Sequence, residues 1–296
     1  MHLEDVQPMS PGKGQVLVRV RAAAANPMDW KIRSGAMKFI TGRRFPRGLG
    51  HDFAGTVVGV GTGVTRFEVG DDVLGAMSMK ASGAFAEMVV AEENLIVIKP
   101  VRLSFEQAAA LPTVGVTALQ CVIDKGELHP GESVFVNGCL GGVGRAAAQI
   151  ALMHGAYVAG SCRDTAMVDA KALGISPVVD FDFDPMRLKG QFDLVIDTAG
   201  TLSFRDARAL LKPRGRIVDI NATPAKMARS LFSRAFKPLF AKYSPEALET
   251  VSDAAAGGEL AIPVAGAAPL TQAINALAHL ERAHTPTGGK LVIVPQ

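Results

Sequence analysis

The stretch VFVNGCLGGVGR, residues 134–145, decides the fold that this sequence predicts. Residues 133–136 read as a short buried strand and residues 144–154 as a helix, so the glycines stand where a strand passes into a helix. Glycine permits a sharp turn there and lets the backbone approach a ligand closely. The free N–H groups at the helix start then attract an anion. The stretch therefore predicts a turn that binds the diphosphate of a dinucleotide.

The glycines of this turn follow the spacing Gly-x-x-Gly-x-x-Gly and not the stricter Gly-x-Gly-x-x-Gly. A glycine motif alone also fits a packing turn that binds nothing. The strand before it, the helix after it and the strand–helix units that follow favour a cofactor. Arg145, at the helix start, would add a charge-assisted contact. The turn residues that we expect to bind the cofactor are Asn137, Gly138, Gly141, Gly142, Val143 and Gly144.

Strands alternate with helices after this turn, which predicts a doubly wound Rossmann domain, a parallel sheet with helices on both faces. The expected strands are 157–160, 177–180, 193–197 and 216–220, and the expected helices are 165–173 and 204–211. Ligands bind at the carboxyl ends of such strands. Thr198 and Asn221 lie at strand ends, so we expect both to contact the cofactor.

The end of the second strand of this domain bears on the choice between NADPH and NADH. A site for NADH usually offers an acid there to the ribose hydroxyls. Here the strand ends with Ser161, and Arg163 suits a 2′-phosphate, so we expect Ser161 and Arg163 to bind NADPH. We expect Asp164 to cap the next helix. If the strand ran further, Asp164 would face the ribose and NADH would fit.

The composition indicates a globular protein. The chain has 296 residues, of which 48% are hydrophobic and 20% charged, enough for one large or two ordinary domains. A net charge of +3 without a basic block does not favour nucleic acid as a partner. No apolar run has the length of a membrane span and no signal peptide is recognisable, so we expect no membrane partner and a cytoplasmic location.

The part of the chain before Pro100 reads as short strands with glycine corners, which predicts a compact β-barrel-like unit. Its expected strands are 15–21, 54–60 and 86–90. Ser104 and Gln107 form a capping-box pattern that opens a helix. Near the C-terminus we expect helices at 245–256 and 270–283 and a strand at 290–294.

A series of short pieces, in order along nearly the whole chain, resembles the zinc-free quinone oxidoreductases of the medium-chain dehydrogenase/reductase superfamily. The pieces are NPMDWKIRSG (26–35), GHDFAG (50–55), FEVGDDV (67–73), GAFAE (83–87), LPTVGVTA (111–118), the glycine turn and GGK (288–290). One piece would mean little, but the ordered set is specific to the superfamily, though not to a substrate.

This resemblance implies an α/β protein with a GroES-like catalytic domain, residues 1–103 and 241–296, and a Rossmann domain, residues 104–240, inserted between its parts. NADPH and a small-molecule substrate would meet in the cleft, and a homodimer would be the commonest assembly. The resemblance places Asn26 and Thr117 beside the nicotinamide and Lys290 near the cofactor. Relatives usually have a further strand before the segment that matches Gln15, and we expect it to be absent or altered here.

The zinc-dependent alcohol dehydrogenases of the same superfamily place a cysteine near residues 26–29, and His-Glu where this chain has His51-Asp52. Here the first cysteine is Cys121, and the only others are Cys139 and Cys162, so neither a structural zinc lobe nor a disulfide framework is possible. We therefore expect no metal. His51 would be a buried or cleft-lining polar residue and Asp52 a structural hydrogen-bond acceptor.

Without zinc, oxidation of an alcohol lacks its Lewis acid. Hydride delivery from NADPH to a quinone or an α,β-unsaturated carbonyl is the easier reaction, because conjugation spreads the negative charge. We expect Asn26 and Lys31 to bind the oxygen of the acceptor. Asn26 also fits a simple turn before Pro27, and Lys31 and Lys290 also fit solvated surface charges. The proton donor stays open between water and Lys31.

Two other functions also fit the sequence. An enoyl-thioester reductase of fatty-acid or polyketide type would show a wider cleft with basic residues near its mouth, which the segment 229–242 would supply. A sensor, or a structural protein that kept the fold, would bind NADPH without turning over any acceptor.

Overall fold

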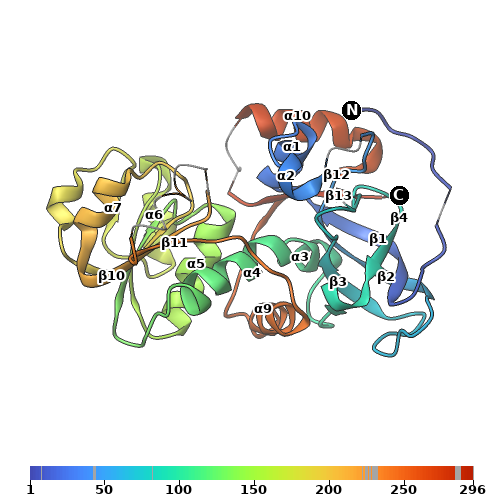
Figure 1. The fold of residues 1–296 in the computed structure, drawn as a ribbon, viewed down its shortest axis with the longest axis horizontal. Coiled ribbons are helices and arrows are strands. Elements are labelled where there is room, and N and C mark those ends of the chain that lie inside the picture. The colour runs from blue at the N-terminus through green and yellow to red at the C-terminus, as the bar shows by residue number, and fades with distance from the viewer. Residues whose placement is uncertain are drawn as a thin grey trace. The chain divides into compact units, whose positions relative to one another are not determined.

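The computed structural model describes residues 1–7, 9–42, 45–81, 83–221, 223, 226, 228, 233–283 and 288–295. The chain divides into two compact units, shown as ribbons in Figure 1. The first unit combines Met1–Thr113 with Tyr243–Gln296, and the second is Val114–Lys242. The first boundary therefore falls after Thr113, where the sequence placed it after Leu103, because helix α3 (Phe105–Ala109) packs on strands of the first unit.

A mostly antiparallel sheet forms the first unit, and in the described residues it has seven strands. Strand β1 pairs with β2 along one edge and with β4 and β13 along the other. Strand order is β12-β13-β1-β2-β3-β5, with β4 beside β1, and among the described strand pairs only β12–β13 is parallel. The strands are β1 (Gln15–Ala24), β2 (Asp52–Val60), β3 (Asp72–Ala76), β4 (Met88–Glu92), β5 (Ile96–Ile98), β12 (Val264–Pro269) and β13 (Lys290–Val294).

Alternation along β1 builds the core of this unit. Val16, Val18 and Val20 are buried, while Arg19 and Arg21 between and beyond them are exposed. The buried valines pack in one cluster with apolar side chains of the neighbouring strands. No strand precedes β1 in the described residues.

The helices of the first unit include one that the sequence predicted by its cap. At the start of α3, the Ser104 hydroxyl accepts from Gln107 N–H, and the Gln107 side chain accepts from Ser104 N–H. The other helices are α1 (Pro27–Arg33), α2 (Lys38–Thr41), α9 (Pro245–Gly257) and α10 (Ala273–Ala283), with short 3₁₀ turns at Glu93–Leu95 and Leu270–Gln272. Helix α4 (Pro112–Leu119) runs from the first unit into the second.

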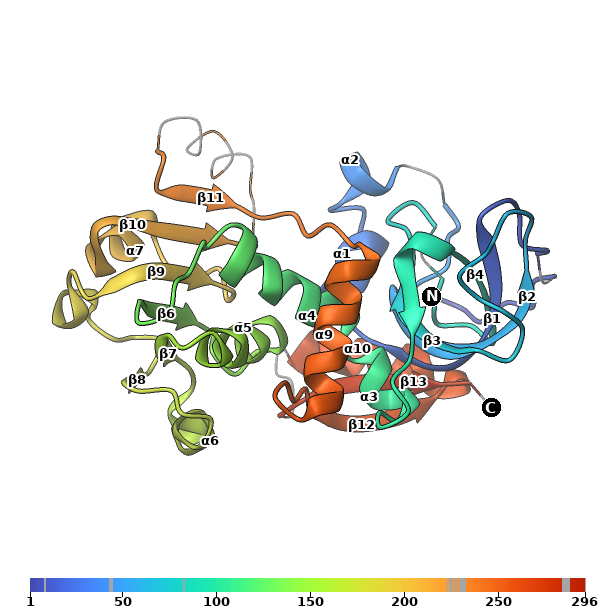
Figure 2. The same cartoon turned by 90° about the horizontal axis from the view of Figure 1, so that it is seen from below.

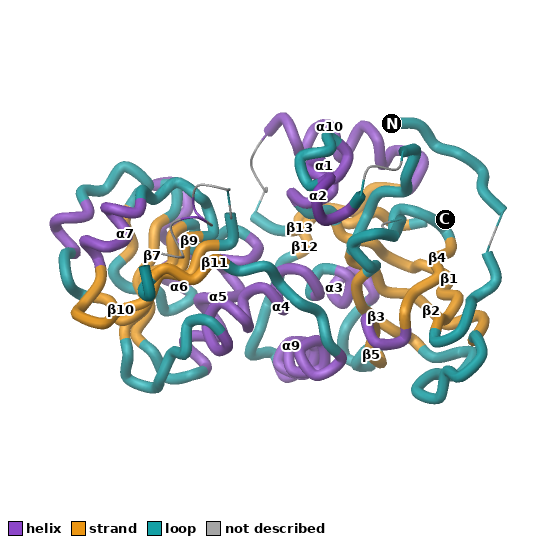
Figure 3. Tube along the Cα trace, in the orientation of Figure 1, coloured by secondary structure: helices purple, strands orange, loops and turns teal. Residues whose placement is uncertain are grey.

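A parallel sheet forms the second unit, and its six strands within the described residues follow the order β11-β10-β9-β6-β7-β8. Helix α5 (Gly142–Met153) packs on β6 and β7, as Figure 2 shows. Figure 3 separates the strands of this unit from the helices that cover them. The strands are β6 (Ser133–Asn137), β7 (Tyr157–Ser161), β8 (Val178–Val179), β9 (Phe192–Asp197), β10 (Leu211–Asp219) and β11 (Phe236–Pro238).

The other helical elements that the structure describes in the second unit lie before or between these strands. They are a π-helical turn at Gln120–Asp124, 3₁₀ turns at Asp164–Ala166 and Pro185–Leu188, α6 (Met167–Ala172) and α7 (Phe204–Leu210). The predicted α/β fold, a GroES-like sheet unit and a Rossmann unit, is confirmed. Among the described residues, no helix has both the length and the apolar character needed to cross a membrane.

Candidate functional site

The glycine turn after β6 is as tight as the sequence predicts. Gly138 has a φ of +81°, a conformation that favours glycine. Its N–H donates to the Ser161 carbonyl and hydroxyl oxygens, each at 3.1 Å. Gly144 lies so close to the turn that a Cβ there would be 2.0 Å from the Gly138 carbonyl oxygen. The close approach of Gly138 and Gly144 therefore requires glycine at position 144.

The start of α5 offers backbone donors to a ligand. Gly141 is the N-cap residue, and no side chain caps the helix there. The N–H groups of Gly142, Val143 and Gly144 make no hydrogen bond to the rest of the described chain. A Cβ on Gly141 would meet nothing but the Gly138 carbonyl oxygen, at 3.3 Å, so the space above the turn is open. This cradle fits the diphosphate of a dinucleotide.

Polar side chains beneath the turn connect three neighbouring strands. The Ser161 hydroxyl donates to Asn137 Oδ1 at 2.6 Å, and Asn137 Nδ2 donates to Asp197 Oδ1 at 2.7 Å. Thr198 Oγ1 donates to the Asn137 carbonyl oxygen at 2.7 Å. Asn137, Ser161 and Thr198, which the sequence assigned to the cofactor, thus hold the turn in place through bonds of their own.

The carboxyl ends of β7 and β10 carry the other residues that the sequence assigned to the cofactor. Arg163 is exposed just beyond β7. The expectation that Asp164 caps the next helix is wrong, because the 3₁₀ turn begins at Asp164 itself and Arg163 is its N-cap residue. Asn221, beyond β10, donates to the Thr198 carbonyl oxygen at 3.2 Å. Thr117 is buried in α4.

The first unit contains a network of six polar side chains, which we call the polar network: Asn26, Asp29, Asp52, Thr113, Tyr243 and Lys290. Asp52 lies at its centre. Asn26 Nδ2 and Thr113 N–H both donate to Asp52 Oδ2 at 3.0 Å, and the Thr113 hydroxyl donates to Asp52 Oδ1 at 2.6 Å. The Tyr243 hydroxyl lies 2.9 Å from the Thr113 hydroxyl.

Lys290 and Asp29 complete the polar network on the other side of Asn26. The Lys290 ammonium is buried and donates to Asn26 Oδ1 and, at 2.7 Å, to the Ala25 carbonyl oxygen. Asp29 Oδ2 accepts from Asn26 N–H at 2.7 Å, as the third residue of a capping box at the start of α1. Burial raises the pKa of Asp29 to about 7, and the Asp52 carboxylate adds to the rise. Burial lowers the pKa of Lys290.

His51 lies against the polar network without a hydrogen bond of its own. Its ring is fully buried, with its centroid 5.1 Å from that of Tyr243 and a tilt of 57°. Neither ring nitrogen has a partner in the described residues. Burial lowers the pKa of His51, so the neutral imidazole is favoured.

The donor atoms around His51 do not fit zinc. A zinc site needs three or four donors from His, Cys, Asp or Glu, and the described residues hold no group of three. Both ends of the nearby Asn26 amide are bonded to protein groups. We therefore derive no step through a metal.

The polar network contains two of the residues that the sequence singled out. Asn26 and Lys290 were predicted, but Lys31 is exposed on α1 and the structure does not bring it into the polar network. Thr113 and Tyr243 were missed as functional residues. The LPTVGVTA piece was a signal for Thr113, whereas Tyr243 has no local signal because its partners are far away in the sequence. Of the basic segment 229–242, residues 229–232 lie outside the described part of the chain.

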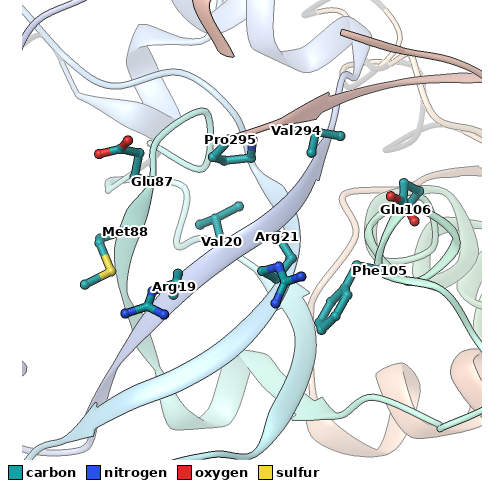
Figure 4. Close-up of a pocket in the computed structure, with 9 residues that line it drawn as sticks. All are labelled: Arg19, Val20, Arg21, Glu87, Met88, Phe105, Glu106, Val294 and Pro295. Carbon is teal, nitrogen blue, oxygen red and sulfur yellow. The ribbon is translucent and has the colours of Figure 1, made fainter. Parts of the chain in front are cut away.

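A separate pocket of about 640 Å³ lies on the first unit, away from these residues. Figure 4 shows it beside β1, with the Arg21 side chain next to Phe105. The Arg21 guanidinium lies 5.1 Å from the centroid of the Phe105 ring. None of the predicted site residues lines this pocket.

The GroES-like sheet unit and the inserted parallel-sheet unit with its glycine turn define the medium-chain dehydrogenase/reductase class of oxidoreductases. Residues 12–101 match the alcohol dehydrogenase GroES-like domain, and residues 173–293 match the zinc-binding dehydrogenase domain. A chloroplast envelope quinone oxidoreductase homolog of Arabidopsis thaliana is 30% identical over 97% of this chain and 91% of its own. The chain belongs to the quinone oxidoreductase family of this superfamily.

Two further proteins are similar to this chain. The solved structure of the quinone oxidoreductase from Coxiella burnetii is 30% identical, has a TM-score of 0.91, and covers 100% of this chain and 95% of its own. A 2-methylene-furan-3-one reductase of Solanum lycopersicum is 37% identical over 63% of this chain and 50% of its own. Membership of this family implies an oxidoreductase that uses a nicotinamide cofactor and a small-molecule substrate.

Proposed function

We propose that the chain is an NADPH-dependent reductase that passes a hydride to a quinone or an α,β-unsaturated carbonyl compound without zinc. The observation that carries the proposal is the row of free N–H groups at Gly142, Val143 and Gly144 above the tight turn at Gly138. The acceptor class rests on the relatives named for quinones and for 2-methylene-furan-3-one, which is a conjugated enone.

The chemistry needs positioning more than it needs a Lewis acid. The bound nicotinamide supplies the hydride, and the conjugated acceptor spreads the charge that develops on its oxygen. In this proposal the turn holds the diphosphate, and Thr117 and Asn221 orient the nicotinamide half. The hydrogen bonds of Asn26 make it a positioning residue for Asp52 and Lys290. Lys31 as a contact of the acceptor stays a prediction.

The test of this function is a panel of acceptors. We expect stopped-flow loss of NADPH absorbance with a small quinone and with an enone, and a much slower loss with crotonyl-CoA. Fast turnover of crotonyl-CoA alone would favour the enoyl-thioester reductase. NADPH binding without turnover of any acceptor would support the sensor or structural protein instead. The cytoplasmic location and the homodimer stay predictions, and the Arabidopsis relative is named for the chloroplast envelope.

The preference for NADPH rests on Arg163, exposed beyond β7. Replacing Arg163 with Ala removes a charge-assisted partner of the 2′-phosphate, so the Kd for NADPH should rise by about 10-fold to 100-fold. The Kd for NADH, which lacks that phosphate, should change little. Fluorescence titration with both cofactors measures the difference, and equal losses would contradict the phosphate assignment. In that case the Asp164 carboxylate beside Arg163 would support NADH.

A further inference from the structure

The polar network of the first unit runs from the buried Lys290 ammonium to Tyr243, which is partly exposed. Asn26, Asp52 and Lys290 are buried, whereas Thr113 and Tyr243 are partly exposed. Asp29 is buried as well, so a molecule that reaches the network from solvent meets Thr113 and Tyr243 before the other four members. From these contacts we propose that Tyr243 is the proton donor that completes the reduction, an inference that rests on the proposed function.

The hydrogen bonds fix which hydroxyl carries a transferable proton. Thr113 has a single hydroxyl proton, and Asp52 Oδ1 accepts it at 2.6 Å. Tyr243 must then be the donor in its own 2.9 Å contact with the Thr113 oxygen. Burial raises the pKa of Tyr243, and the Asp52 carboxylate raises it further, so the phenol keeps its proton until an acceptor takes it.

The other candidate acids around the network are buried, whereas Tyr243 is partly exposed. The Lys290 ammonium donates to the Ala25 carbonyl oxygen and to Asn26 Oδ1. Asp29 faces the N–H of Asn26, and His51 is fully buried. The ring of Tyr243 packs against that of His51, which holds the phenol in place, and its hydroxyl lies at the end of the hydrogen-bonded series.

The proposed step balances for an enone. When the hydride has formed a C–H bond at the β-carbon, the electron pair of the C=C bond moves through the conjugated system and leaves an enolate. The enolate α-carbon then forms a bond to the Tyr243 proton, and the O–H bond of Tyr243 breaks. The Tyr243 phenolate then takes a proton from water, so the sum is addition of one hydride and one proton.

The experiment replaces Tyr243 with Phe and uses 2-methylcyclohex-2-enone as the probe. This change keeps the ring against His51 and removes only the hydroxyl. We expect kcat with this enone to fall about 100-fold or more, the usual contribution of a positioned general acid, with the Kd for NADPH unchanged. With a quinone the loss should be small, because the oxygen of a hydroquinone anion takes a proton from water unaided. The matched control is Tyr157→Phe, since Tyr157 is 71% exposed at the start of β7 and should tolerate the change.

The stereochemistry of the product gives a second readout that a purely structural role would not move. The unmodified enzyme should form one configuration at the α-carbon, and Tyr243→Phe should form a nearly racemic mixture. Thr113→Val, which keeps the phenol but removes its partner, should lower kcat less than Tyr243→Phe and retain one configuration.

The outcomes separate this inference from the proposed function. Lack of turnover of quinone and enone by the unmodified enzyme would remove the proposed function and the donor with it. Normal turnover together with an unchanged rate and configuration in Tyr243→Phe would overturn the donor alone. If Tyr243→Phe failed to fold, the unmodified enzyme and two Thr113 variants would still test Tyr243 as the donor. A racemic α-carbon from the unmodified enzyme would overturn this role equally. A single configuration that is lost in Thr113→Phe but kept in Thr113→Val would support it.

Discussion

Single residues of the first unit show how far the sequence could predict the site. Lys290, in the GGK piece of the family resemblance, was predicted to lie near the cofactor or at the surface. In the structure it is buried and bonded to Asn26, which is distant in sequence. A local motif marks a residue as unusual, but it does not identify partners that β-sheet pairing brings together. Tyr243 was not predicted as a site residue for the same reason, because its partners Thr113 and His51 come from other parts of the chain.

Asp29 makes the stability of the protein depend on pH. Its folded pKa is raised from 3.8 to about 7, so the neutral form stabilises the fold below the unfolded pKa, and this contribution is lost as pH rises through about 7. Asp29→Asn cannot ionise and keeps an oxygen for the Asn26 N–H. The free energy of unfolding of the variant relative to the unmodified protein should therefore rise between pH 4 and pH 8, by at most about 4 kcal/mol.

Urea denaturation at several pH values measures this difference for Asp29. Asp253→Asn is the control, because Asp253 is exposed on α9. The free energy of unfolding of this variant should differ from that of the unmodified protein by the same amount at every pH. A constant difference between Asp29→Asn and the unmodified protein would contradict the effect of burial on this carboxyl.

Elements with a strong local pattern were predicted, and those with a weak one were not. The alternation of β1 and the cap of α3 were both visible in the sequence. Strand β12 (Val264–Pro269) was missed because its small residues show no alternation, and it forms by pairing with β13. Helix α1 was missed because its seven residues are too few for a helical period to be recognised.

The start of α5 gives a prediction at the scale of an element. Gly144→Ala places a Cβ 2.0 Å from the Gly138 carbonyl oxygen, so the turn must open. We expect the free energy of unfolding to fall by about 1–3 kcal/mol and the Kd for NADPH to rise by about tenfold or more. Gly257→Ala is the control, because open space surrounds Gly257 at the end of α9. The free energy of unfolding of this variant should rise by up to about 1 kcal/mol. Fluorescence titration measures the affinity for NADPH. An unchanged affinity in Gly144→Ala would contradict binding of the diphosphate at the start of α5.

The N-terminal and C-terminal parts of the chain fold together into the first unit. Strand β1 from the N-terminal part pairs with β13 from the C-terminal part, and β13 also pairs with β12. The second unit, Val114–Lys242, has its own sheet and its own core around Phe135 and Ile217. The first unit therefore depends on the last strand of the chain, whereas the core of the second unit does not.

Removal of residues 288–296 tests this dependence. The truncated chain loses β13, which exposes one edge of β12 and part of an edge of β1, and it loses the Lys290 ammonium that satisfies Asn26. We expect the first unit to unfold and reductase activity to disappear, while the second unit still binds NADPH through its own turn. Limited proteolysis should leave a resistant fragment close to residues 114–242. Removal of residues 1–7, which contain no helix or strand, is the control and should preserve activity. A truncated chain that resists proteolysis over its whole length would show that β13 does not hold the first unit together.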